Sequence, residues 1–266
     1  MKLYTRTSGD GPDLVLIHGW GMHGGVWDSL VPLLEPAFRV TRIDLPGHGR
    51  SAWNGATGLD DLVAVVLAAA PEVAAWLGWS LGGLIAARAA VEAPARIERL
   101  VLLASSPSFV RRTDWQPAML PALLEVFAAD LQQDYVRTLH RFLALQVRGS
   151  EAAGAVLRSL HNTLLAQGRP VPGALDAGLE ILRTADLRSR FAEIACPVLL
   201  LMGERDTLVP LAAGRQAAQL LADAQVRVIA GSGHAPFIAQ PRQVAAVLEE
   251  FLQPVRTRPA GEVHGD

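Results

Sequence analysis

The sequence has little cysteine, no long apolar run and no excess of positive charge, and each of these absences excludes a class of protein. Its 266 residues include one cysteine, Cys196, which excludes an internal disulfide and fits a reducing compartment. The longest apolar run, 62–70, is far shorter than the ~20 residues of a membrane helix, and the N-terminus lacks the apolar stretch of a signal peptide. The net charge of −2 provides no basic field for nucleic acid. We therefore expect a cytoplasmic, monomeric protein that binds neither membranes nor nucleic acid.

Short apolar runs and helical patterns alternate along most of the chain, and half of all residues are hydrophobic. The runs of strand length are 14–17, 40–43, 73–77, 100–103, 198–202 and 226–229. The helical patterns lie at 26–34, 59–69, 81–91, 211–221 and 241–252. Continuous apolar runs are typical of strands buried on both faces of a sheet. We predict an α/β fold with a mostly parallel sheet and helices on both faces.

The alternation stops between residues 107 and 190, where the sequence is helical in period and contains no convincing strand. We predict that this segment is a helical cap inserted between two strands, while 1–106 and 191–253 form the core. The alternative is that these are extra packing helices without a role. Residues 254–266 have no apolar period, and we predict that they are disordered.

An early glycine-rich stretch, LIHGWGMHGG at 16–25, raises the question of a cofactor. Its glycines are spaced G-x-G-x-x-G after an apolar run, and Asp44 lies 20 residues beyond the third one, as in dinucleotide sites. Such sites need small residues so that a pyrophosphate can approach, whereas Trp20 and other bulky side chains crowd these glycines. The sequence contains neither a phosphate-binding G-x-x-x-x-G-K-[ST] nor a metal-binding H-E-x-x-H. We expect no cofactor and no metal.

The strongest catalytic signal is GWSLGG at 78–83, which follows an apolar run and precedes a helical pattern. A G-x-S-x-G sequence between a strand and a helix is typical of a nucleophile elbow, a turn too sharp for side chains on either side of the serine. The turn would expose Ser80 at the carboxyl edge of the sheet, above a helix N-terminus that favours negative charge. Ser80 is therefore the predicted nucleophile.

A serine nucleophile needs a base and an acid that orients the base. In this arrangement the two follow the serine in the order acid, then histidine, each on a loop after a later strand. The run 198–202 is followed by GERDTLVP, and the run 226–229 by AGSGHAP. We predict His234 as the base and Asp206 as the acid, with Glu204 as the competing acid. The oxyanion would be bound by the backbone N–H groups of Leu81 and Trp20.

Taken together, HGWG, DLPGHGRS, GWSLGG, GERDTLVP and GSGHAPF resemble the α/β-hydrolase superfamily in order and spacing over nearly the whole chain. Trp20, Trp79, ASSP at 104–107, FLALQ at 142–146, GLEIL at 178–182 and HAPF at 234–237 are similar to the methyl ester esterases of biotin synthesis. The resemblance implies an α/β-hydrolase fold. It also implies a substrate, a methyl-capped pimeloyl chain on acyl-carrier protein, which is hydrolysed to the free acid and methanol.

The resemblance also implies which residues contact the substrate. Trp20, Ser80, Leu81 and His234 would lie at the reacting ester. The acyl channel under the cap would be lined by Phe142, Leu143, Ala144, Leu145 and Gln146. The alternative for this last stretch is plain helix packing.

The predicted cap is also basic, with five arginines against Asp134 and Glu151 between residues 134 and 169. Arg137, Arg141 and Arg148 would share one helical face at 100° per residue, and Arg158 follows. Acyl-carrier proteins are acidic, so such a face would dock one and weaken with salt. An ordinary solvated face is the alternative.

The catalytic motifs do not separate several activities. A general short-chain carboxylesterase acting on small esters, or a carbon–carbon bond hydrolase of the same fold, would use the same three residues. A hydrolase-fold receptor that binds a small molecule with little turnover is the alternative from another class.

Overall fold

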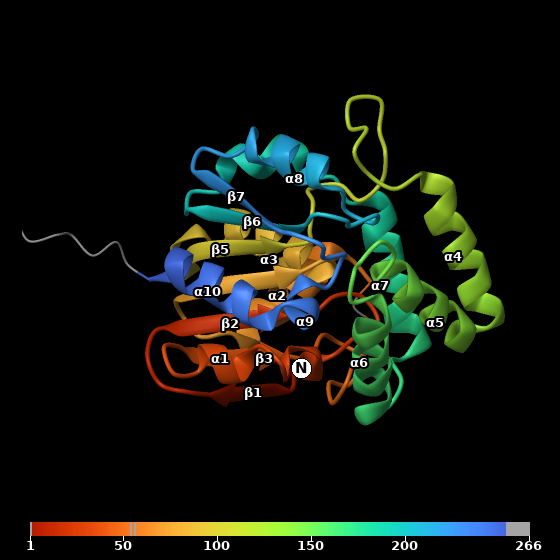
Figure 1. Cartoon of the computed structure of the whole chain (residues 1–266), viewed down its shortest axis with the longest axis horizontal. Coiled ribbons are helices and arrows are strands. Elements are labelled where there is room, and N and C mark those ends of the chain that lie inside the picture. The colour runs from red at the N-terminus through yellow and green to blue at the C-terminus, as the bar shows by residue number, and fades with distance from the viewer. Residues whose placement is uncertain (1, 54, 56, 254–266) are drawn as a thin grey trace, which may run out of the picture.

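The computed structural model describes residues 2–53, 55 and 57–253. Its centre is a seven-stranded β-sheet (Figure 1). The strand order is β1-β3-β2-β4-β5-β6-β7, with β1 antiparallel to β3 and all other pairs parallel. The strands are β1 (Thr5–Ser8), β2 (Asp13–Ile17), β3 (Arg39–Ile43), β4 (Ala74–Trp79), β5 (Ile97–Leu103), β6 (Val198–Gly203) and β7 (Ala224–Ile229). The carboxyl ends of the six parallel strands therefore meet at one edge.

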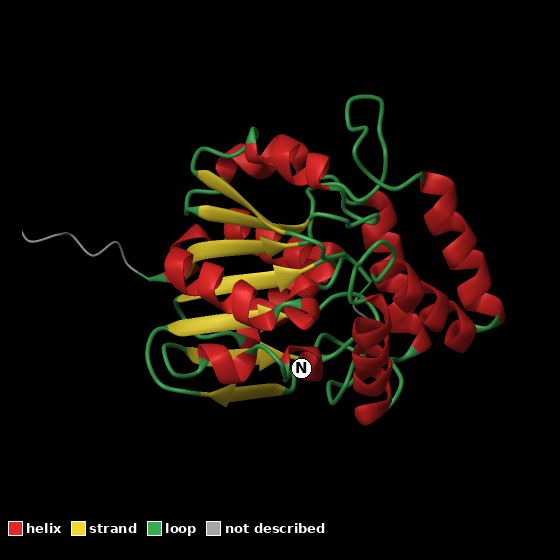
Figure 2. Ribbon diagram, viewed as in Figure 1, coloured by secondary structure: helices red, strands yellow, loops and turns green. Residues whose placement is uncertain are grey.

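Helices cover both faces of the sheet, as the ribbon in Figure 2 shows. The short α1 packs beside α10 on one face, and α2 packs beside α3 on the other. The helices of these layers are α1 (Val31–Leu34), α2 (Leu59–Ala69), α3 (Leu81–Glu92), α8 (Leu211–Ala218), α9 (Pro236–Ala239) and α10 (Pro241–Leu252). The strands β2, β4 and β6 are almost wholly buried between the layers, as their apolar runs predict.

Four further helices lie between β5 and β6 in the sequence and stand together beyond the carboxyl ends of the strands (Figure 1). They are α4 (Pro121–Gln133), α5 (Tyr135–Gln146), α6 (Ala153–Ala166) and α7 (Pro172–Thr184). We call residues 107–190 the cap. Its separation from the core as a domain of its own stays a prediction, and the predicted disordered tail, 254–266, lies outside the described residues. Within the described ranges, no helix has the length and apolarity needed to cross a bilayer.

The structure differs from the predicted elements at three places. β1 is absent from the prediction because its sequence, TRTS, is polar and it lies at the sheet edge. The helix predicted at 26–34 is wrong: a 3-10 turn, η1 (Gly24–Trp27), ends before α1, whose first turn holds Pro32, a residue unsuited to a helix interior. β7 is an edge strand and is not buried on both faces, since Val228 is exposed.

Candidate active site

Ser80 lies at the turn between β4 and α3 in a backbone conformation that few residues other than glycine adopt. Its φ of 54° is one of two positive values among the described residues other than glycine. Two neighbouring strands hold the turn, because the N–H of Ser80 donates to the carbonyl of Leu103 at 3.0 Å. Such strain persists only where the surrounding contacts over-determine it, as in a nucleophile elbow.

Three glycines make this turn possible. A Cβ on Gly78 would meet the backbone of Gly82, and one on Gly82 would meet the carbonyl oxygen of Ile17. A Cβ on Gly83 would lie 2.5 Å from both the Cβ and the Oγ of Ser105. Close approach of neighbouring atoms therefore requires all three glycines, and for Gly78 and Gly82, two residues either side of the serine, this is what the sequence predicts.

His234 and Asp206 meet through a buried hydrogen bond, with 2.7 Å between Nδ1 and Oδ2. The other carboxylate oxygen of Asp206 accepts from the N–H groups of Leu208 and Val209 at 2.8 and 3.0 Å. Because a carboxylate only accepts hydrogen bonds, Nδ1 carries the proton and Nε2 is the basic nitrogen. Nε2 is buried and has no hydrogen-bond partner within the described residues, so it can take a proton.

The histidine loop also contacts the residue before the nucleophile. Nε1 of Trp79 donates to the carbonyl of His234 at 2.8 Å, and the two ring centroids are 5.7 Å apart. The competing acid, Glu204, is half exposed and accepts instead from the N–H of Gly231 at 2.8 Å. The geometry therefore places Asp206, not Glu204, on the histidine.

The glycine-rich loop HGWG lies directly against the elbow. A Cβ on Gly19 would be 3.2 Å from the Cβ of Ser80. His18 shapes this loop: its Nε2 accepts from the N–H of Leu45 at 2.9 Å, so its Nδ1 donates to the carbonyl of Gly19 at 2.8 Å. Neither the Trp20 N–H nor the Leu81 N–H has an acceptor within the part of the chain that is described. Both are available for an oxyanion.

Asp44, the acid that would bind a ribose in a dinucleotide site, forms hydrogen bonds within the protein instead. It is buried, and its two carboxylate oxygens accept from the N–H groups of Gly24 and Arg50 at 2.6 and 2.9 Å. The 20-residue spacing therefore reflects a bond that ties the glycine loop to the loop after β3, and both oxygens are already occupied.

Three backbone carbonyls of cap helices hold the histidine loop and the glycine-rich loop. The carbonyl of Gln146 in α5 accepts from the N–H of His234 at 3.0 Å, and that of Leu175 in α7 accepts from Nε1 of Trp20 at 2.8 Å. Nδ1 of His23 accepts from the N–H of Gly25, so its Nε2 donates to the carbonyl of Thr163 in α6 at 2.6 Å. Sequence reasoning missed these contacts, because backbone acceptors leave no signature in residue type.

Helix α7 approaches the oxyanion loop through Gly178. A Cβ there would lie 2.7 Å from Cδ1 of Trp20 and 3.2 Å from Cδ2 of Leu81. The only sequence signal for this approach is a glycine inside a helical pattern. On its other side, the ring of Trp20 packs edge-on against Phe142, with 4.8 Å between the centroids.

The stretch FLALQ does not present one uniform lining. Phe142, Leu143 and Gln146 are buried, Leu145 is half-buried and Ala144 is exposed on the outer side of α5. Five consecutive helical residues spread over all sides of the helix. Of the predicted lining residues, Phe142 lies against Trp20, and the Oε1 atom of Gln146 is buried without a partner in the described residues. The expectation for Ala144 is therefore wrong.

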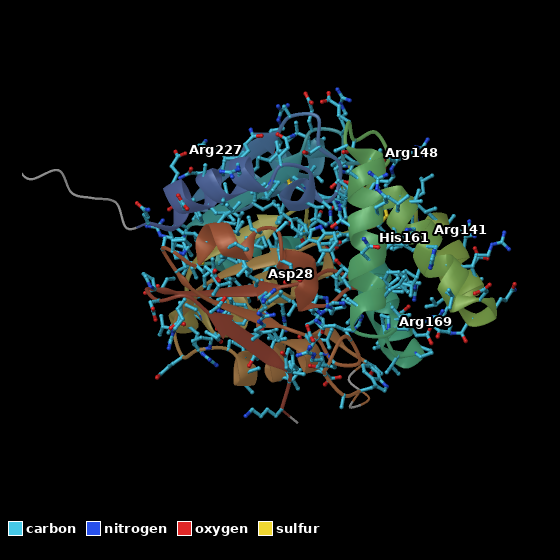
Figure 3. All side chains as sticks on the ribbon, turned by 60° about the horizontal axis from the view of Figure 1, so that its bottom comes forward. Asp28, Arg141, Arg148, His161, Arg169 and Arg227 are labelled. Atoms are coloured by element: carbon cyan, nitrogen blue, oxygen red, sulfur yellow. The ribbon has the colours of Figure 1, made fainter. Side chains whose placement is uncertain are left out.

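The predicted arginine face of one helix is also wrong. Arg148 follows the end of α5 at Gln146, so it does not continue the row of Arg137 and Arg141. Arg141 forms an ion pair with Asp130 of α4. Arg158 belongs to α6. All four are exposed, and Figure 3 shows Arg141, Arg148 and Arg169 on the cap, with Arg227 on the opposite side of the molecule.

Two buried histidines beside the site are expected to make stability depend on pH. Burial lowers the pKa of His48 to about 4, and burial followed by the nearby His48 holds the pKa of His18 well below its usual range. The unfolded chain, with a histidine pKa of ~6.5, then binds more protons as the pH falls, so stability present above pH 6.5 is lost toward pH 4. His48 alone accounts for about 2 kcal/mol between pH 7 and 5. Urea unfolding of wild type and His48→Gln checks this; equal pH slopes for the two would contradict it.

The comparisons with known proteins agree with this geometry. Residues 12–241 match the family model of the alpha/beta hydrolase fold. The chain belongs to this family. A pimeloyl-[acyl-carrier protein] methyl ester esterase from Nitrosomonas europaea is 43% identical, with 93% of this chain and 98% of that protein aligned. The protein of the same name from Pectobacterium carotovorum is 47% identical, with 94% and 98% aligned.

Solved structures give the same fold. An esterase from Exiguobacterium antarcticum superposes with a TM-score of 0.86 at 21% identity, covering 95% of this chain and 96% of its own. A hydrolase from Pseudomonas aeruginosa superposes with a TM-score of 0.80 at 28% identity, covering 95% and 94%. The first of these likenesses is one of fold alone.

Proposed function

We propose that the chain is a serine carboxylesterase that hydrolyses the methyl ester of pimeloyl-[acyl-carrier protein] in biotin synthesis. The observation that carries this proposal is the bonded Asp206–His234 pair, which contacts Trp79 next to the strained Ser80, in a chain more than 40% identical to esterases of that name. A general short-chain carboxylesterase would share the pair and the serine, so the substrate needs its own test.

In the proposed reaction, Oγ of Ser80 attacks the ester carbonyl carbon while its proton passes to Nε2 of His234. The negative oxygen of the tetrahedral intermediate accepts from the N–H groups of Trp20 and Leu81. When the intermediate collapses, the C–O bond to the methoxy group breaks and His234 returns the proton, which releases methanol. Water then attacks the acyl-enzyme, its proton passes through His234 to Ser80, and the free carboxylic acid leaves. Asp206 holds the imidazole in the required tautomer throughout.

The cap supplies the surfaces for the remainder of the substrate. We assign Phe142 and Gln146 to the acyl chain, because Phe142 packs on Trp20 and Gln146 adjoins the histidine loop. The exposed guanidinium groups of Arg137, Arg148 and Arg158 have no ion-pair partner within the described residues, which leaves them free for an acidic carrier protein. Arg141 contributes less, because Asp130 already neutralises it.

The test compares methyl pimeloyl-carrier protein with a short free methyl ester. The carrier-bound ester is expected to be demethylated, with kcat/KM falling as salt rises, while the free ester shows little salt dependence. An Arg137→Ala/Arg158→Ala double variant should lower kcat/KM for the carrier ester by about tenfold and leave the free ester unchanged. Arg227→Ala is the matched control, since it also removes an exposed charge but lies away from the cap. If the free ester turns over and the carrier ester does not, the enzyme is a general esterase.

A further inference from the structure

A second residue with positive φ lies beside Ser80 and turns another serine toward it. Ala104 follows β5 with a φ of 44°, and β5 is the strand next to β4, with Leu103 in register with Trp79. The turn at Ala104 places Ser105 over the elbow, where its side chain is buried against Gly83. In the described residues other than glycine, the two positive φ values thus stand side by side at the ends of neighbouring strands.

The hydroxyl of Ser105 donates to the carbonyl of Ser80, with 2.8 Å between the two oxygens. This carbonyl belongs to the same peptide group as the N–H of Leu81, the proposed oxyanion donor. Because the peptide is planar and trans, its C=O and N–H point in opposite directions, so a bond to the oxygen fixes where the N–H points. A hydrogen bond to the C=O also polarises the peptide and strengthens its N–H as a donor.

We propose that Ser105 is a positioning residue, whose hydroxyl orients and polarises the Ser80–Leu81 peptide for oxyanion binding. The inference rests on the proposed function, because it assigns Ser105 to the oxyanion site of that esterase. It acts through Leu81 and does not touch the substrate. The effect acts on the barrier and not on substrate binding, since negative charge on the oxygen is absent from the bound ester and develops in the transition state and the tetrahedral intermediate.

A merely structural role predicts something different. The carbonyl of Ser80 also accepts from the N–H groups of Gly83 and Leu84 at 2.9 and 3.3 Å. Removing the Ser105 hydroxyl therefore leaves no buried carbonyl without a partner, and the expected loss of stability is limited to that of one hydrogen bond. The expected effect is on the N–H of Leu81, on the other side of the same peptide group, which becomes a weaker hydrogen-bond donor.

The experiment compares Ser105→Ala with the matched control Ser106→Ala. Ser106 is a neighbouring buried serine whose hydroxyl also donates to a backbone carbonyl, that of Ser108, at 2.8 Å. Turnover of a p-nitrophenyl ester is measured together with inhibition by an alkyl trifluoromethyl ketone, which forms a charged tetrahedral adduct on the serine. The matching methyl ketone reports ground-state binding.

Ser105→Ala is expected to lower kcat about three- to tenfold with KM unchanged, well below the roughly 10²- to 10³-fold effect of deleting an oxyanion donor. Its inhibition constant for the trifluoromethyl ketone should rise by the same factor, while that for the methyl ketone stays constant. Ser106→Ala should change none of these. The proposal is overturned if Ser105→Ala keeps the wild-type kcat, or if its affinities for the two ketones fall by the same factor.

Two further variants keep the result unambiguous. If Ser105→Ala does not fold, Ser105→Cys keeps the size of the side chain with a weak donor and should show the same changes. Ser80→Ala separates the two hypotheses: if it abolishes turnover while Ser105→Ala is unchanged, the esterase stands and only the role of Ser105 fails. If Ser80→Ala retains full turnover, the proposed function itself fails.

Discussion

Replacing Ser80 by alanine is expected to lower kcat for ester hydrolysis by about 10⁵- to 10⁶-fold. The change removes the atom that attacks the carbonyl, while the N–H groups of Trp20 and Leu81 remain and account for the residual rate. Steady-state hydrolysis of a p-nitrophenyl ester measures the loss, and mass spectrometry should detect an acyl adduct in wild type only.

The control for this variant is binding. Ser80 contributes no side-chain hydrogen bond to the fold in the described residues, so Ser80→Ala should melt within a few degrees of wild type and still bind the carrier-bound ester. Turnover above a tenth of the wild-type rate in a pure preparation would show that another group is the nucleophile.

The second large effect is expected for Asp206→Asn, with kcat lower by about 10⁴-fold. The N–H groups of Leu208 and Val209 both donate to Oδ1 of residue 206, so the side chain must keep an acceptor oxygen at this position. The amide NH₂ of asparagine must then face Nδ1 of His234, which forces Nδ1 to accept and moves the ring proton to Nε2. A histidine protonated at Nε2 cannot take the proton of Ser80.

Glu204→Gln is the matched control, because Glu204 is the neighbouring acid on the same loop. Within the described residues its carboxylate accepts from the N–H of Gly231 and pairs loosely with Arg205, and it does not contact His234. Its kcat should stay within about twofold of wild type. If the two variants exchanged these outcomes, the acid would be Glu204.

The predictable parts of this molecule are those in which chemistry forces a local pattern. The elbow needs glycines at 78 and 82 because backbone atoms meet there, and at 83 because the side chain of Ser105 lies close, so the sequence shows the turn directly. The inner strands β2, β4 and β6 are apolar because both their faces are covered, whereas β1 could not be predicted because an edge strand needs no apolar run.

The parts that could not be predicted depend on contacts between distant segments. The prediction that Arg137, Arg141 and Arg148 share one helical face required a helix that continues through Arg148. The helix ends at Gln146, whose carbonyl accepts from the N–H of His234. Asp44 has the spacing of a ribose-binding acid, and only its two bonds to backbone N–H groups reveal its use. The role proposed for Ser105 likewise rests on a strained turn at Ala104, a residue with no preference for such a turn.

The bonds between the cap and the catalytic loops have a consequence for protein engineering. Since their acceptors are the main-chain oxygens of Gln146, Thr163 and Leu175, exchanging the side chains at these positions leaves the bonds intact. These three positions can therefore be varied for other acyl groups without removing the bonds that hold the histidine and the oxyanion loop, whereas Gly178 and Phe142 pack on Trp20 itself. At the three positions, selectivity and catalytic geometry are separately adjustable.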